Sequence, residues 1–100
     1  MGRMKKAANP RDAVRLEQLP NIGPSVAGDL RGIGIKSPKD LKGKDPLALY
    51  ERLNLATQAV HDPCVLDTFM SAVAFMDGKG AKPWWDFTPK RKALLTKRGR

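Results

Sequence analysis

The sequence predicts an all-α fold, a compact bundle of about five to six short helices, and two observations support this prediction. Apolar residues recur at helical spacing in successive segments, whereas no run alternates apolar and polar residues for long. In addition, the sequence repeats a pair in which a residue suited to cap a helix is followed by proline, which is favoured in the first helical turn. This pair occurs at Asn9-Pro10, Ser37-Pro38, Asp45-Pro46 and Asp62-Pro63. The 100 residues, 41% of them hydrophobic, are enough for one small domain with a modest core.

The first two expected helices lie before residue 35. One follows Asn9-Pro10 and is stopped by Pro20. Its apolar face consists of Ala13, Val14, Leu16 and Leu19. Pro24 then begins a second helix, which glycines 32 and 34 are expected to end. Its single buried stripe consists of Val26, Ala27, Leu30 and Ile33.

The remaining expected helices follow the other proline pairs. Short helices begin after Ser37 and Asp45, and residues 54–61 are expected to be a connection. The second of these helices buries Leu47 or Leu49, together with Tyr50 and Leu53. The helix after Asp62 has the longest apolar face and is expected to be the main packing partner. Its face consists of Val65, Leu66, Phe69, Ala72, Val73 and Met76, with Phe75 at its edge. Thr88-Pro89 begins a last basic helix that extends to about Lys97.

The connection Leu19-Pro20-Asn21-Ile22-Gly23 predicts a tight turn between the first two helices. The start of the second helix presents backbone N–H groups that have no intrahelical acceptor, at the positive end of the helix dipole. A phosphate can bind there. Ile22 is expected to tuck between the helices, while Asn21, Gly23 and Ser25 face outward. The segment resembles a helix-hairpin-helix motif, although the usual first glycine is Asn21 and the basic residue that often follows is absent.

A longer resemblance extends over about residues 13–90. The order of residues is similar to that in the small bacterial pathogenicity-locus proteins, whose relatives are also labelled mitomycin-resistance-like. The matching segments are 19–23, 29–35, 40–43, 45–46, 49–53, 62–66, Phe69 and Trp84-Trp85. The resemblance implies a compact helical domain that binds DNA through the hairpin. The domain boundaries expected are a flexible basic N-terminus over 1–9, a single helix-hairpin-helix domain over 10–88, and a basic C-terminal helix or tail over 89–100.

The formal net charge of +9 resides at the two ends of the chain, because residues 11–88 contain as many acidic as basic residues. Basic termini attract polyanions such as DNA, or simply aid solubility. The residues expected to contact phosphate are Asn21, Ile22, Gly23, Ser25, Arg31, Lys36, Ser37 and Lys39, with tail contacts from Lys90, Arg91, Lys92, Lys97, Arg98 and Arg100. Such contacts read no bases, so binding is expected to be independent of sequence. The alternative is that residues 19–25 form only an αα-hairpin turn.

The similar element Gly32-Ile33-Gly34 lies at the opposite end of the same expected helix. The carbonyl end of a helix dipole repels phosphate, so the two glycines are interpreted as caps. Ile33 and Ile35 are interpreted as core residues. Lys36 and Ser37 remain candidates for a second phosphate contact.

No enzymatic centre, metal site or cofactor is expected. Cys64 is the only cysteine, which excludes an internal disulfide and a multi-cysteine zinc site. Cys64 lies three residues after His61, but we interpret it as a core residue and Asp62 as an N-cap. No apolar run is long enough to cross a membrane, and a cytoplasmic protein is expected.

Two functions remain open at this point. One is sequence-independent DNA binding, in a DNA-damage or mitomycin-resistance context. The other is a protein-interaction module with no direct nucleic-acid role, which binds its partner through Trp84 and Trp85. One of these tryptophans is also expected to close the core, and stacking on unpaired bases is a further possibility for the pair.

Overall fold

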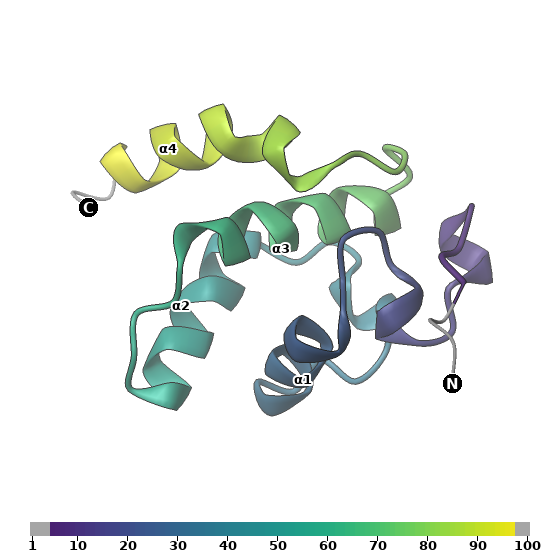
Figure 1. Ribbon diagram of the computed structural model, residues 1–100, viewed down its shortest axis with the longest axis horizontal. Coiled ribbons are helices and arrows are strands. Elements are labelled where there is room, and N and C mark those ends of the chain that lie inside the picture. The colour runs from purple at the N-terminus through teal and green to yellow at the C-terminus, as the bar shows by residue number, and fades with distance from the viewer. Residues whose placement is uncertain (1–4, 98–100) are drawn as a thin grey trace.

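The computed structural model describes residues 5–97, and every regular element in this range is helical (Figure 1). The α-helices are α1 (Pro24–Gly32), α2 (Pro46–Thr57), α3 (Pro63–Met76) and α4 (Thr88–Lys97). Short 3₁₀ turns are η1 (Pro10–Asp12), η2 (Leu16–Gln18), η3 (Pro38–Leu41) and η4 (Trp84–Phe87). The all-α prediction is confirmed. The number of α-helices is four rather than five or six, because the segments around residues 10–18 and 38–41 form only 3₁₀ turns.

Helix α3 lies at the centre of the fold, with α4 along one side and α1 and α2 on the other (Figure 1). Leu66 through Val73, Phe75 and Met76 are all buried, so most of the helix surface is covered. Burying each large apolar side chain contributes roughly 1.5–3 kcal/mol. The prediction that this helix is the main packing partner is therefore confirmed. Phe75, expected at the edge of the apolar face, is only 1% exposed.

The acidic residues before α2 and α3 are N-caps, as their position before proline predicts. The Asp45 carboxylate accepts a hydrogen bond from the Leu47 amide at 3.0 Å. The Asp62 carboxylate accepts one from the Cys64 amide at 2.8 Å, and this bond lowers the pKa of Asp62. These bonds satisfy N–H groups that have no acceptor within the helix. Both caps fix where their helices begin.

The expected connection over residues 54–61 is wrong at its start, because α2 continues to Thr57. Gln58, the residue that caps the end of α2, has left-handed backbone angles (φ 55°). Leu55 in the last turn is 81% exposed, so no buried stripe marks this part of the helix in the sequence.

The helix expected between Pro10 and Pro20 is also wrong, because this segment contains only the 3₁₀ turns η1 and η2. Ala13, Leu16 and Leu19 are nevertheless buried, whereas Val14 is 74% exposed. A spacing of three matches the 3.0 residues per turn of a 3₁₀ helix as well as one face of an α-helix. These three residues are buried as predicted, but the segment forms 3₁₀ turns and not the predicted α-helix.

Both ends of the described chain pack on the domain. The Ala7 amide donates to the Gln18 carbonyl at 2.8 Å and Ala7 is buried, so the expected flexible segment 1–9 is wrong for this residue. The predicted tail contacts Arg98 and Arg100 lie outside the described residues, as do residues 1–4 of the basic N-terminus. Helix α4 packs Leu94 and Leu95 against the core, so the expected tail is a docked helix over 88–97.

A buried ion pair fixes α4 on α3. Asp67 of α3 is fully buried, and its carboxylate accepts a hydrogen bond from Arg91 Nε at 2.8 Å. Arg91 Nη2 donates at 3.3 Å and the Thr88 hydroxyl at 2.7 Å to the other carboxylate oxygen. The Asp67 hydrogen bond raises the pKa of Arg91, which remains charged. Because all three donors come from α4, this contact determines where the basic helix lies.

Candidate nucleic-acid interface

The turn between η2 and α1, residues 19–23, is here called the hairpin turn. Asn21 has left-handed backbone angles (φ 68°), which asparagine tolerates better than most residues. Ile22 is completely buried, as its expected place between the two segments requires. The backbone at Gly23 is extended (φ −95°, ψ −178°). Any residue can adopt this conformation, so the backbone does not require glycine at this position. The strained position in the turn is therefore Asn21.

The Asn21 side chain does not face outward, which corrects the expectation for this residue. Its amide nitrogen donates to Ser71 Oγ and to the Lys82 carbonyl, both at 2.8 Å. Ser71, which is 1% exposed, donates to the same Lys82 carbonyl at 2.8 Å. The network ties the hairpin turn to α3 and to the segment before η4. Asn21 therefore has a structural role in this fold.

The start of α1 is open to solvent. A Cβ atom added at Gly23 would meet no atom within 4 Å, and Pro24 and Ser25 are exposed. Gly23 provides no side-chain cap, and the first-turn N–H groups of Ser25 and Val26 have no acceptor within the helix. The positive end of the helix dipole points to the same place. An anion can approach the backbone here without displacing a side chain.

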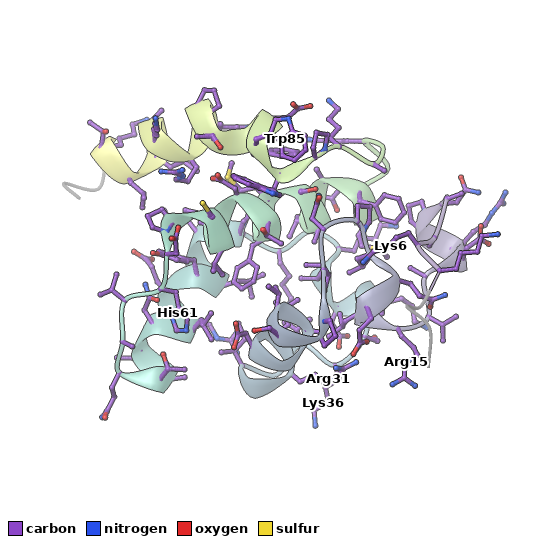
Figure 2. All side chains as sticks on the ribbon, viewed as in Figure 1. Lys6, Arg15, Arg31, Lys36, His61 and Trp85 are labelled. Carbon is purple, nitrogen blue, oxygen red and sulfur yellow. The ribbon has the colours of Figure 1, made fainter. Side chains whose placement is uncertain are left out.

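Lys6 lies against the hairpin turn, a role that no sequence pattern predicts. Its ammonium nitrogen is 2.9 Å from the Glu17 carbonyl oxygen, 2.9 Å from that of Leu19 and 2.7 Å from that of Ile22. Figure 2 labels Lys6 beside this turn. These hydrogen bonds from a charged donor satisfy three carbonyls of the turn. Lys6 therefore holds the turn in place and adds a positive charge to it.

Arg31 of α1 forms a bidentate ion pair with Glu17. The two pairs of atoms are 2.8 Å and 2.9 Å apart, and the Arg31 side chain is 38% exposed. The hydrogen bond from Arg31 is the main cause that lowers the pKa of Glu17 to about 2. Both groups are thus charged at neutral pH. The Glu17 carboxylate therefore offsets the positive charge of Arg31, the residue that was expected to contact phosphate.

The second glycine-containing element lies at the carbonyl end of α1. Ile33 and Ile35 are buried and Gly34 has φ +95°, which confirms the core residues and one glycine cap, whereas Gly32 is the last residue of α1 and not a cap. The Arg52 guanidinium donates to the Ile33 carbonyl, so a cation already neutralises this end of the helix.

The residues after this element bind an acidic side chain. The backbone amides of Lys36 and Ser37 donate to the Asp40 carboxylate at 3.0 and 3.2 Å. These bonds lower the pKa of Asp40. Lys36 and Lys39 have exposed side chains, and Ser37 is partly exposed. Only the two lysine side chains project fully into solvent here.

The predicted tail contacts lie elsewhere on the molecule. Lys90, Lys92 and Lys97 are exposed on α4, whereas Arg91 is bound to Asp67. Helix α4 lies on the side of α3 opposite to α1, and Lys36 and Arg31 are at the far edge of the same view (Figure 2). The basic helix α4 therefore lies in a different region from Arg31 and Lys36.

His61 and Cys64 have structural partners. His61 Nδ1 is 2.9 Å from Asn54 Oδ1, and the His61 carbonyl accepts a hydrogen bond from the Tyr50 hydroxyl. A hydrogen bond with the Asp62 carboxylate, together with burial, raises the pKa of the Cys64 thiol. A raised pKa leaves less of the reactive thiolate. Within residues 5–97, no three His, Cys, Asp or Glu side chains are grouped to hold a metal ion.

Neither tryptophan closes the core, which corrects that expectation. Trp84 is half-buried and Trp85 is 60% exposed, whereas Phe87 of the same turn packs against the core. The two indole rings meet edge to face, with centroids 5.6 Å apart and planes at 83°.

Together these features define a small all-α domain in which a tight turn presents the start of a helix to solvent. Residues 9–93 match the model of the family described as "Pathogenicity locus" (Cdd1), and the chain belongs to this family. It is similar to the "Mitomycin resistance protein McrB" of Streptomyces lavendulae, with 47% identity over 88 residues. That match covers 88% of this chain and 84% of the relative. No solved structure matches the chain.

These findings confirm the expected family. Within residues 5–97, no helix combines the length and the apolar character needed to cross a bilayer.

Proposed function

We propose that the chain binds DNA by holding a backbone phosphate at the start of α1, without reading the base sequence. The observation that carries this proposal is the open N-terminus of α1 beside Gly23. The N–H groups of Ser25 and Val26 are donors for a phosphate oxygen, and the exposed Ser25 hydroxyl is a third. Contacts to phosphate fix the position of a protein on DNA but carry no direct sequence information.

The charges around the hairpin turn support an anionic ligand. Lys6 places an ammonium group 2.7 Å from the Ile22 carbonyl, directly before Gly23. Lys36 and Lys39 add exposed charges after α1. Arg31 contributes less, because Glu17 is bound to it. Long-range attraction of this kind accelerates association and weakens as salt is added.

We place this binding in a mitomycin-resistance context, because a relative with 47% identity bears that name. DNA damage is the setting that this association suggests. The proposal assigns no reaction to the chain, and the raised pKa of Cys64 argues against a role as nucleophile. A cytoplasmic location accords with a chain that has one cysteine.

A protein-interaction module is the second candidate. Its expected surface is Trp84 and Trp85, of which Trp85 is 60% exposed, and Leu55 and Val60 are also 81% and 87% exposed. Apolar side chains that remain this exposed in the free protein are typical of binding surfaces when they cluster. A chain that binds no DNA at low ionic strength would favour this alternative.

A charge substitution at the hairpin turn tests the DNA proposal. Gly23→Glu places a carboxylate where the phosphate binds, and it meets no steric obstacle in the fold. We expect duplex affinity to fall by at least about tenfold, because each 1.4 kcal/mol of lost interaction is tenfold. The measurement is a fluorescence-anisotropy titration of a labelled duplex over a range of salt concentrations.

Gly32→Glu is the matched control, because it introduces the same charge on the same helix in equally open space. It lies about 13 Å along the helix axis from Gly23, beyond the Debye length of about 8–10 Å. We expect its affinity to change by less than about twofold. Equal losses in the two variants, or no loss in either, would contradict phosphate binding at the start of α1.

A further inference from the structure

We propose that Trp85, with the lysines of α4 and of the preceding segment, forms a second site that stacks an unpaired base of single-stranded nucleic acid. Trp85 is 60% exposed, although it belongs to a turn whose other aromatic residues are half-buried. An indole this exposed has an open ring face. Stacking of bases on aromatic rings is tolerant of sequence, because every base has a π-face.

The exposed ring is held in place by its neighbours. Trp84 is half-buried and packs edge to face against it, at a centroid distance of 5.6 Å. The turn η4 packs against both α3 and α4. Two hydrogen bonds to the Lys82 carbonyl, from Asn21 and Ser71, fix the chain just before η4. A stacking ring held in this way loses little side-chain freedom when a base binds.

Lysines before and after η4 favour a polyanion at Trp85, against one opposing charge from the exposed Asp86 beside it. Lys82 precedes η4 and Lys90 lies in the first turns of α4, and both side chains are exposed. Lys97, seven residues after Lys90, lies on the same flank of α4, whereas Lys92 lies on the opposite flank, and Arg91, Leu94 and Leu95 form the inner side. Residues 88–97 contain no acidic side chain. A strand whose base lies on Trp85 can therefore place its phosphates along Lys90 and Lys97.

This site is distinct from the proposed site at the hairpin turn. Figure 2 places Trp85 beside α4, whereas α1 lies on the other side of α3, and the two regions meet where Asn21 of the hairpin turn donates to the Lys82 carbonyl. The two sites also differ in chemistry, since one uses backbone N–H groups and the other an aromatic ring. The inference does not depend on the function proposed for the hairpin turn.

The test is binding of an oligothymidylate of about ten nucleotides, within the ~4–16 nucleotides typical of single-strand binding sites. Both tryptophans of the chain lie in η4, so their fluorescence reports on this turn alone. We expect the oligothymidylate to quench this fluorescence at low salt. An abasic oligomer of the same length should bind more weakly and cause little quenching, because it has the charges but no bases.

Labelled oligothymidylate and anisotropy then compare variants of the full chain. We expect Trp85→Ala to weaken binding about 5- to 100-fold and Trp85→Phe to retain part of the affinity. Leu55→Ala, which removes an apolar side chain from α2 that is even more exposed than Trp85, should leave the affinity unchanged. Circular dichroism verifies that each variant is folded.

Three results would overturn the inference. The first is equal binding of oligothymidylate and the abasic oligomer, which would assign the affinity to charge alone. The second is unchanged affinity in Trp85→Ala, which would leave the exposed ring to a protein partner. The third is a loss in Gly23→Glu as large as that in Trp85→Ala, which would place the single strand at the hairpin turn. Normal oligothymidylate binding by Gly23→Glu supports two separate sites.

Discussion

Replacing Arg91 with leucine is expected to lower the free energy of unfolding by about 3–5 kcal/mol, the usual cost of removing one partner from a buried ion pair. Asp67 is fully buried, and Arg91 supplies two of the three hydrogen bonds that its carboxylate accepts. Without Arg91, only the Thr88 hydroxyl remains at 2.7 Å. Urea unfolding followed by circular dichroism measures the loss.

A double variant separates the charge from the packing. Asp67→Leu combined with Arg91→Leu removes both charges, so no carboxylate is left buried without a cation. We expect it to recover most of the stability that the single variant loses, because buried pairs can be replaced by apolar residues at little cost. A single variant that loses less than about 1 kcal/mol, or a double variant no more stable than the single one, would contradict this account of α4 docking.

Replacing Asn21 with alanine is expected to lower the free energy of unfolding by about 3–4 kcal/mol. Two hydrogen bonds are lost, to Ser71 and to the Lys82 carbonyl, at about 1 kcal/mol each. Alanine must also adopt left-handed backbone angles at φ 68°, which costs about 1–2 kcal/mol. The free energy of unfolding in urea is again the measurement.

A second variant separates these contributions. Comparing Asn21→Ala with Asn21→Gly measures the backbone cost of alanine at φ 68°, because both variants lose the side-chain hydrogen bonds. Asn21→Gly relieves the backbone strain and removes only the side-chain hydrogen bonds. We expect Asn21→Gly to be less stable than the wild type but to keep its duplex affinity. If Asn21→Gly is as stable as the wild type, the hydrogen-bond network contributes nothing to stability.

The helices that carry the core could be predicted because local signals agreed. Asp45 and Asp62 precede proline, and both proved to be N-caps. The apolar spacing after Asp62 identified α3 as the central helix. Between Pro10 and Pro20 the same reasoning failed, because burial at every third residue fits a 3₁₀ turn and an α-helix alike.

The parts of the site that the sequence did not reveal depend on contacts between distant residues. Lys6 was assigned to a flexible basic terminus, yet it binds the carbonyl of Ile22 sixteen residues away. Arg91 was counted as a tail charge, yet its partner Asp67 is 24 residues away in α3. Side-chain contacts of this range have no periodicity for a sequence pattern to detect. The sequence predicts the left-handed backbone angles of Asn21 correctly. It does not predict that the Asn21 side chain points inward to Ser71.

The most direct test of the central claim is a ¹H–¹⁵N correlation spectrum of the protein titrated with a short DNA duplex. Amide shifts report which backbone N–H groups meet the ligand. The account predicts the largest changes at the amides of Gly23, Ser25 and Val26, because these lie at the open start of α1. Changes confined to α4, with those three amides unmoved at saturation, would contradict it.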